Sequence, residues 1–223
     1  MAAAGATGSS KKGNTVRTIS EIEGYLKSCQ TVFWQAVFRA ETDYLLQHVA
    51  GGDEILSVGC GPAIIESALS AHGCRVTGLD VSPEALGRAP DTIRTVVARA
   101  EDMPFPADSF DAVIYVASLQ FIENYEKALH RTTRVLRPHG KLLALLLNPA
   151  SQFFKAKLLD PNSYLRHIRH TDLKAVENAI AAHFIVQTEY YLGVKGEAIF
   201  PSQDPREAVL YIVRGAKRTP LPV

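Results

Sequence analysis

Residues 55–63 read Ile-Leu-Ser-Val-Gly-Cys-Gly-Pro-Ala, an apolar strand that leads into a glycine turn and then a helix. Gly59 and Gly61 let the backbone approach a ligand closely, and the start of the helix offers free N–H groups and the positive end of its dipole. A glycine turn of this kind is by itself weak evidence for any ligand class. The flanking sequence therefore has to decide both the fold and the ligand.

On both sides of this turn the chain alternates between strand and helix patterns. Apolar runs predict strands over residues 54–58, 75–79, 93–97, 110–115 and 141–147. Helical patterns lie between them, over residues 62–71, 83–87 and 125–136. Pro62 is expected at the first helical position, where its missing N–H would have had no partner anyway. Unbroken apolar strands that alternate with helices indicate a parallel sheet covered on both faces.

After Asn148 the alternation weakens. A helix is predicted over residues 172–182 with Thr171 as its N-cap, and strands over 184–192 and 208–214. The 15 residues between these two strands include two Pro and two Gly and show no helical pattern, which favours an antiparallel pair. We therefore expect a Rossmann-like α/β fold, a doubly wound sheet of about seven strands that is mostly parallel with a C-terminal antiparallel hairpin. A six-stranded dinucleotide fold would instead need a helix between every pair of strands.

The length of 223 residues suits one domain with a complete core. Residues 1–18 are expected to form a disordered tail, and residues 216–223 a second tail. The rest of the chain, residues 19–215, is expected to be a single domain. Within it, residues 19–50 have helical spacing and form an N-terminal helical cap, and the polar, aromatic stretch 151–170 is a candidate lid.

The composition excludes several classes of protein. Lys plus Arg total 24 against 23 Asp plus Glu, which argues against a nucleic-acid binder and gives no polybasic reason to sit on a membrane. The longest apolar run, Leu142–Leu147, is far shorter than a membrane span. Three widely spaced Cys without a metal-ligand pattern argue against a disulfide framework or a zinc site, so we expect a cytoplasmic protein without a metal.

The position of Asp80 indicates which class of ligand the glycine turn binds. It ends the second predicted strand, about 20 residues after the glycine turn, where an acidic residue can accept hydrogen bonds from both ribose hydroxyls of a nucleoside. A dinucleotide fingerprint would need a third glycine at position 64, which is Ile64. A nicotinamide-dependent reductase is therefore disfavoured, both by Ile64 and by the terminal hairpin.

Five segments in sequence then carry a resemblance to a known family. They are residues 57–63, 78–83, 100–105, 109–114 and 134–142. In this order and spacing they resemble class I S-adenosylmethionine-dependent methyltransferases, in particular the type 11-like group that acts mostly on small molecules. The resemblance covers residues 54–147 and implies S-adenosyl-L-methionine as cofactor and a small molecule as methyl acceptor.

The resemblance also implies roles for individual residues. The methionine half of the cofactor would be lined by Gly59, Cys60 and Gly61, chiefly through their backbone. The ribose hydroxyls would be held by Asp80, and the adenine face would pack on Val81. The adenine edge would be reached by Ala100 and Glu101, and the sulfonium would lie near Val116.

Three residues depart from the family pattern. The family often has an acid where this chain has Ser57, and a third glycine where it has Ala63. It usually has Asp or Asn where this chain has Arg99, which cannot accept a hydrogen bond from the adenine amino group. Ser57 and Arg99 motivate an alternative hypothesis, a non-catalytic protein of this fold that binds S-adenosylmethionine or S-adenosylhomocysteine as a partner or regulatory subunit.

The acceptor side has candidates but no signature. The stretch after the fifth strand supplies Tyr164, Arg166, His167, Arg169 and His170, which could bind the acceptor, with His167 or His170 as a catalytic base. The other interpretation is a partly solvated amphipathic segment without a role in chemistry.

Two residues elsewhere could also face the acceptor. Trp34 on the N-terminal helix could close over it or simply pack in the core, and Gln120 after strand four could face the methyl group or lie at the surface. The leading hypothesis is methyl transfer to a small molecule by in-line displacement, in which the cofactor supplies the activation and the protein supplies alignment.

Overall fold

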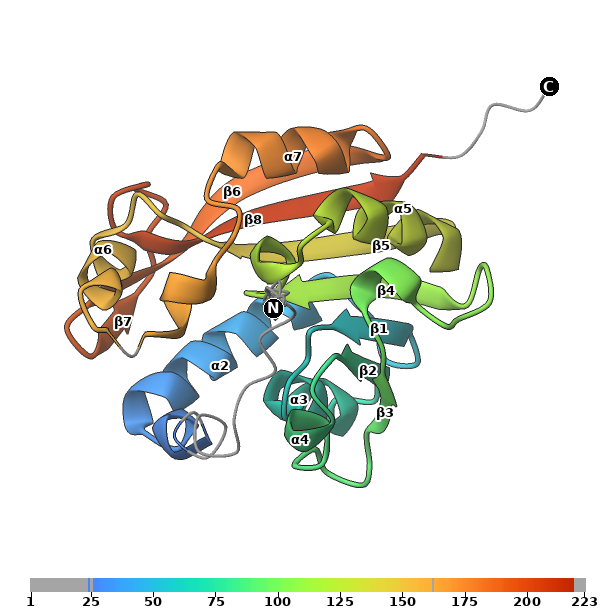
Figure 1. Ribbon diagram of the computed structural model, residues 1–223, viewed down its shortest axis with the longest axis horizontal. Helices are drawn as coiled ribbons and strands as arrows, with labels where there is room; N and C mark the ends of the chain where they lie inside the picture. Colours follow the sequence, from blue (N-terminus) through green and yellow to red (C-terminus); the bar gives the residue numbers. More distant parts are fainter. Residues whose placement is uncertain (1–23, 25, 162, 219–223) are drawn as a thin grey trace, which may run out of the picture.

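The computed structural model describes residues 24, 26–161 and 163–218. Its strands are β1 (Glu54–Val58), β2 (Arg75–Asp80), β3 (Arg94–Val97), β4 (Phe110–Val116), β5 (Leu136–Leu147), β6 (Phe184–Lys195), β7 (Ala198–Phe200) and β8 (Ala208–Lys217). They form one sheet in the order β3-β2-β1-β4-β5-β8-β6-β7 (Figure 1). Strands β1 to β5 pair in parallel, whereas β8 pairs antiparallel with both β5 and β6. The mostly parallel sheet with an antiparallel C-terminal part is thus confirmed.

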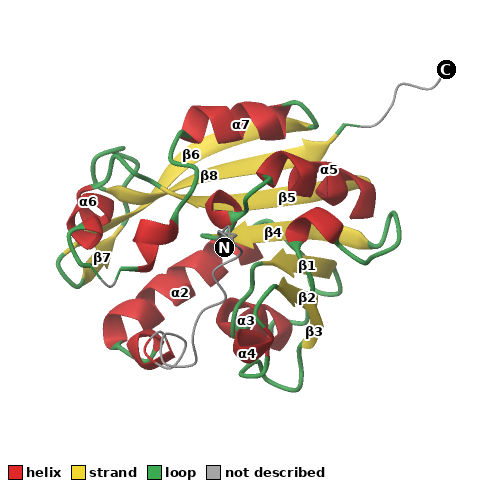
Figure 2. Ribbon diagram, viewed as in Figure 1, coloured by secondary structure: helices red, strands yellow, loops and turns green. Residues whose placement is uncertain are grey.

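Helices cover both faces of this sheet (Figure 2). They are α2 (Val32–Leu46), α3 (Ile64–Ala71), α4 (Pro83–Leu86), α5 (Tyr125–Val135), α6 (Gln152–Leu158) and α7 (Leu173–Ala181), with the short 3-10 helices η1 (Ala100–Asp102), η2 (Leu119–Phe121) and η3 (Tyr164–His167). The helices α2, α3 and α6 contribute to one buried hydrophobic cluster, and α5 and α7 contribute to a second one.

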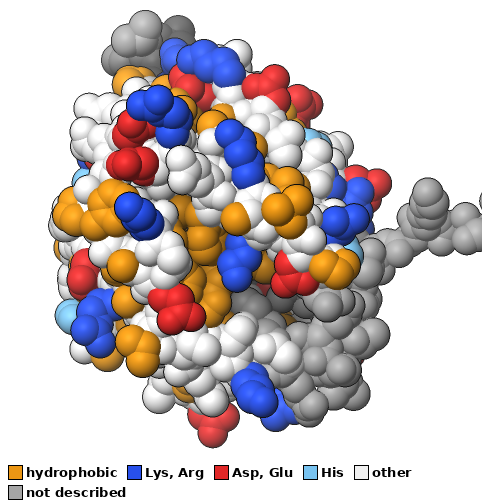
Figure 3. Space-filling model, turned by 90° about the vertical axis from the view of Figure 1, so that its left-hand side faces the viewer, with side chains coloured by type: hydrophobic (Ala, Val, Ile, Leu, Met, Phe, Trp, Pro, Cys, Tyr) orange, Lys and Arg blue, Asp and Glu red, His pale blue; other side chains and the backbone are white. Residues whose placement is uncertain are grey.

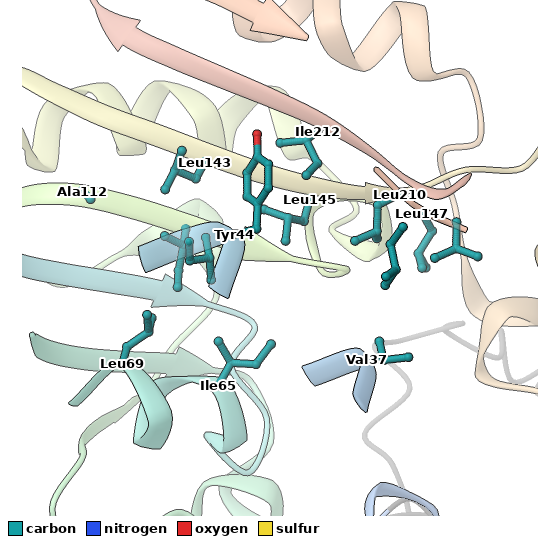
Figure 4. Close-up of a cluster of buried hydrophobic side chains, with 14 of the residues drawn as sticks. Val37, Tyr44, Ile65, Leu69, Ala112, Leu143, Leu145, Leu147, Leu210 and Ile212 are labelled. Atoms are coloured by element: carbon teal, nitrogen blue, oxygen red, sulfur yellow. The ribbon is translucent and has the colours of Figure 1, made fainter. Parts of the chain in front are cut away.

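Strand β5 shows why its sequence is an unbroken apolar run. Its side chains alternate between the two clusters, because successive residues of a strand point to opposite faces. Leu143, Leu145 and Leu147 lie in the cluster under α2 and α3 (Figure 4). Leu142 and Leu146 lie in the cluster under α5 and α7. Both faces of the strand are therefore buried, as a doubly wound sheet requires.

The start of α3 differs from the prediction. The helix begins at Ile64 and not at Pro62, because Ala63 has a left-handed backbone with φ of 57°. A residue in that conformation cannot belong to a right-handed helix. The glycine turn is consequently longer than predicted, and Pro62 belongs to it.

Other features also differ from the prediction, among them the start of β5, which lies at Leu136 and not at residue 141. The N-cap of α7 is Asp172, whose carboxylate accepts from the N–H of Ala175, and not Thr171. A short strand, β7, pairs with the end of β6 and brings the sheet to eight strands. The predicted C-terminal tail begins inside β8, since Lys217 still pairs with Phe184. The predicted tail 1–18 and residues 219–223 lie outside the described part of the chain.

Helix α2 positions the rest of the N-terminal cap. It begins after Thr31, whose hydroxyl accepts from the N–H of Trp34, just beyond the break predicted near residues 28–30. Tyr44 near its other end donates to Glu189 of β6 at 2.6 Å, and Tyr191 of β6 donates to the carbonyl of Ala40 at 3.1 Å. No helix among the described residues has the length and apolar character needed to cross a bilayer.

Candidate cofactor-binding site

The glycine turn after β1 is held by the end of β2. The N–H groups of Gly59 and Cys60 both donate to the carbonyl of Leu79, at 2.7 and 3.3 Å. The N–H of Gly61 donates to a carboxylate oxygen of Asp80 at 2.9 Å. Gly59 and Gly61 have φ of 76° and 54°, in the left-handed region that favours glycine. The turn is therefore a fixed backbone loop and its shape depends on Asp80.

The two glycines have different surroundings. A Cβ added to Gly59 would lie 2.6 Å from the Cβ of Ser118, whose hydroxyl donates to the carbonyl of Val58, so close packing against the loop after β4 requires glycine there. A Cβ added to Gly61 would meet nothing within 4 Å. Gly61 thus borders open space beside the N-terminal end of α3, which is where the methionine half of the cofactor would fit.

Asp80 has the geometry expected of a ribose ligand. One carboxylate oxygen accepts from the N–H of Gly61 and the other from the N–H of Ser82, both at 2.9 Å. A carboxylate has about four acceptor positions, so each oxygen retains capacity for another donor. Two backbone groups therefore fix the orientation of Asp80 while it can still accept from two hydroxyls.

Beyond Asp80, the ends of β2 and β3 expose apolar side chains. Val81 is 42% exposed and Val97 is 57% exposed, and both are among the few large hydrophobic residues of the described chain that are exposed. An adenine ring would cover such a surface favourably. These positions are consistent with the adenine contact that the resemblance implies for Val81.

The side chain of Glu101 has partners within the protein. It is buried, forms a salt bridge with Arg99 at 2.8 Å and accepts from the N–H of Asn124 at 3.4 Å. Arg99 also lies 3.6 Å from Glu123. The carboxylate of Glu101 therefore joins η1 to the start of α5, and the adenine contact implied for Ala100 and Glu101 stays a prediction.

Cys60 lies within the turn, and Val116 lies at the end of β4, the strand next to β1. The thiol of Cys60 lies against Gly78 of β2, where an added Cβ would be 2.6 Å from the sulfur. Burial, together with the charges of Glu66 and Asp80, raises the pKa of this thiol far above its usual range, so it stays protonated and is no nucleophile. Val116 ends β4 and is partly buried beside the turn-forming Ala117.

Beneath the turn lie two buried carboxyl groups that the sequence analysis did not single out. Ser57 of β1 donates from its hydroxyl to Glu66 of α3 at 2.5 Å, and both side chains are buried. Burial raises the pKa of Glu66 to about 7. Burial and the charge of Glu66 raise the pKa of Glu41, on α2, to about 8. The sequence feature that could have indicated this site is Glu41, an acidic residue within the apolar face of an amphipathic helix.

On the acceptor side, aromatic rings gather between α2 and α6. Trp34 packs against Phe33, Phe38 and Phe153, with ring centroids 5.2 to 6.4 Å apart. Tyr164 of η3 stacks on Phe121 of η2 at 6.0 Å. The structure therefore places Trp34 in an aromatic cluster that is only partly buried, which is compatible with both interpretations offered for it.

Gln120 has a structural role. Its amide N–H groups donate to the carbonyls of Leu147 and His170, both at 3.1 Å, and its oxygen accepts from the N–H of Leu147 at 2.7 Å. The residue is 1% exposed, so the predicted surface position is wrong, and a position that faces the methyl group stays a prediction. It joins the end of β5 to the segment before α7.

The cationic residues of the stretch after β5 differ in exposure. A ring nitrogen of His170 lies 2.9 Å from the carbonyl of Ile122, and the ring packs edge-on against Tyr125 at 4.6 Å. Three residues are exposed, namely Arg166, His167 and Arg169. Of the two candidate bases, His167 is thus the accessible one. Among the described residues, no group of three or more His, Cys, Asp or Glu could hold a metal ion.

Comparisons with known proteins show similarity to methyltransferases. Residues 56–144 match a protein family described as a methyltransferase domain. A demethylmenaquinone methyltransferase of Tropheryma whipplei is 30% identical over 140 residues, which are 60% of this chain and 57% of that protein. A protein of Aspergillus luteorubrus named as a probable methyltransferase is 30% identical over 182 residues, 72% of this chain and 63% of that protein. The chain thus matches little more than half the length of these relatives.

Solved structures agree on the fold. A SAM-dependent methyltransferase of Thermotoga maritima superposes with a TM-score of 0.75 at 16% identity, covering 90% of this chain and 98% of that one. Phosphoethanolamine N-methyltransferase 2 of Haemonchus contortus, solved with S-adenosyl-L-methionine, gives a TM-score of 0.62 at 22% identity over 79% of this chain and 44% of that one. The sheet order, the glycine turn and these matches together show that the chain has the fold of S-adenosylmethionine-dependent methyltransferases, and that residues 56–144 are similar to a methyltransferase domain.

Proposed function

We propose that this protein binds S-adenosylmethionine across the carboxyl ends of β1, β2 and β4 and transfers its methyl group to an apolar small molecule. The observation that carries the proposal is the glycine turn, fixed by Leu79 and Asp80, with open space at Gly61. Asp80 would accept from the ribose hydroxyls, Val81 would pack on adenine, and Val116 would lie near the sulfonium. The cofactor supplies an activated methyl group, and the protein aligns the acceptor for in-line attack.

The character of the acceptor follows from the surface beside this turn. On the side of the molecule that carries α6 and β7, apolar side chains gather in a hollow, with basic and acidic side chains around it (Figure 3). The aromatic cluster around Trp34 and Phe153 lies between α2 and α6. Such a surface favours an apolar ring compound. The name of the Tropheryma whipplei relative, a demethylmenaquinone methyltransferase, supports an acceptor of this kind.

In this proposal α2 and the segment 151–170 cover the acceptor, and His167 is the candidate base for acceptors that must lose a proton. Tyr164, Arg166 and Arg169 lie on the same segment and would contact the polar end of the acceptor. The contacts of Gln120 and His170 with other parts of the chain make them supports of this segment.

The first experiment is calorimetric titration with S-adenosylhomocysteine, with NADH as the control ligand. We expect one-to-one binding of S-adenosylhomocysteine alone, and its loss in Asp80→Ala but not in the exposed control variant Asp91→Ala. Incubation with S-adenosylmethionine and a panel of apolar ring compounds, read by mass spectrometry, then tests methyl transfer. Binding without any methylated product from the panel or from cell extract would favour the non-catalytic alternative, and binding of neither ligand would refute the proposal.

A further inference from the structure

Glu41 and Glu66 form a buried acidic pair next to the glycine turn. Glu66 lies in the first turn of α3 and is 3% exposed, with its carboxyl on the hydroxyl of Ser57. Glu41 is 5% exposed and shares one face of α2 with Val37 and Leu45, which pack in the same cluster as α3. The two helices pack together, and the charges of the two residues influence one another.

This pair has no cationic partner in the described part of the chain. The groups that act on it are acidic or neutral: Asp80 from β2, Cys60 from the turn, Tyr191 from β6 and Ser57 from β1. The carboxyl of Glu41 makes no hydrogen bond to another described residue, although Glu41 is more than nine-tenths buried. Two buried carboxyls without a cation are costly when ionised, so burial raises the pKa of both groups and favours their protonated forms below about pH 7.

A cation that bound between these two carboxyls would instead stabilise their ionised forms. The methionine end of S-adenosylmethionine carries an α-ammonium group, and the open space at Gly61 borders the start of α3, where Glu66 lies. We propose that Glu41 and Glu66 bind the α-ammonium of the cofactor and release protons to solvent as they do so. The inference rests on the proposed function, since it needs the cofactor in this site, and deepens it by assigning the residues that hold the amino group.

Proton release gives a readout that does not depend on activity. S-Adenosylhomocysteine has the ammonium but no sulfonium charge, so it isolates the amino group. Its binding enthalpy, measured at pH 6.5 in buffers of different ionisation enthalpy, should show release of about one proton per ligand, and its affinity should rise up to about tenfold per pH unit between pH 5.5 and 7. At pH 9, where both carboxyls are largely ionised and the free ligand's amino group is partly neutral, proton release should vanish and give way to some proton uptake.

Matched variants and ligand analogues test whether Glu41, Glu66 and the amino group of the ligand cause the proton release. Glu66→Gln and Glu41→Gln should each weaken binding of S-adenosylhomocysteine by about 10- to 100-fold and reduce proton release, whereas the exposed control Glu126→Gln on α5 should do neither. With the unmodified protein, the aminopropyl analogue that lacks the carboxylate should still release protons. The carboxypropyl analogue that lacks the amino group should release none, and this comparison needs no variant to fold.

The outcomes distinguish the two proposals. Failure of all three ligands to bind would refute the proposed cofactor site and this inference with it. Binding of S-adenosylhomocysteine without proton release at pH 6.5, or equal release by the carboxypropyl analogue, would overturn the inference while the cofactor site stands.

Discussion

The buried acid on α2 predicts an unusual pH dependence of stability in the ligand-free protein. Burial raises the pKa of Glu41 from 4.5 to about 8, so the folded state holds a proton that the unfolded state has already lost at neutral pH. A raised carboxyl pKa makes folding less favourable as pH rises: the contribution is intact below pH 4.5 and is lost progressively up to about pH 8. At 1.36 kcal/mol per pH unit this rise corresponds to at most about 5 kcal/mol.

Urea unfolding at several pH values between 5 and 8.5 measures this effect. The free energy of unfolding of the unmodified protein should fall by on the order of 3 kcal/mol over that range, and Glu41→Gln should remove at least half of the fall. Asp43→Asn, an exposed substitution on the same helix, is the matched control and should keep the full fall. An identical pH dependence in Glu41→Gln and in the unmodified protein would show that Glu41 is ionised in the folded state, and the reasoning would fail.

Four further substitutions test the site. Gly59→Ala should destabilise the fold by roughly 2–4 kcal/mol in urea unfolding, because its Cβ would lie 2.6 Å from that of Ser118 at a positive φ; a smaller loss would mean that the loop after β4 yields. Asp80→Ala should weaken S-adenosylhomocysteine binding by roughly 30- to 150-fold in calorimetry, and unchanged affinity would place the ribose elsewhere. Gln120→Ala should cost roughly 2–3 kcal/mol in thermal unfolding, since a buried N–H of β5 loses its acceptor, whereas a neutral result would contradict its structural role. His167→Ala should keep affinity for S-adenosylhomocysteine within about twofold and alter turnover alone; a loss of affinity would bring η3 to the cofactor.

Most of the fold was predictable because its signals are local. The strands β1, β2 and β5 are mostly apolar segments with glycine or proline near their ends. Because both faces of these strands are buried, apolar residues follow one another without alternating polar residues, which makes the strands easy to predict. The start of α3 was not predictable in this way. Pro62 is favourable at a helix start, but Ala63 takes a left-handed backbone that a propensity argument assigns to glycine. The turn imposes that conformation, and a non-glycine residue in it is strained.

Some residues of the candidate site could likewise be predicted from local patterns, and others could not. Asp80 and the two glycines could be predicted because their spacing along the chain is itself the pattern. Gln120 lies just after β4, as predicted, but the sequence does not show that its amide turns inward to the end of β5. Glu41 and Glu66 were missed because they meet only when α2 packs on α3, and their separation in sequence matches no motif.

Helix α2 carries residues that we propose for both binding sites, Glu41 for the cofactor and Trp34 for the acceptor. Trp34 and Glu41 are seven residues apart, so they lie on the same face of the helix, about 10 Å from each other along its axis. Trp34 belongs to the aromatic cluster beside α6, and Glu41 belongs to the acidic pair next to the glycine turn. In the proposed function, ionisation of Glu41 on cofactor binding would therefore change the charge of the helix that also carries Trp34, a candidate contact of the acceptor.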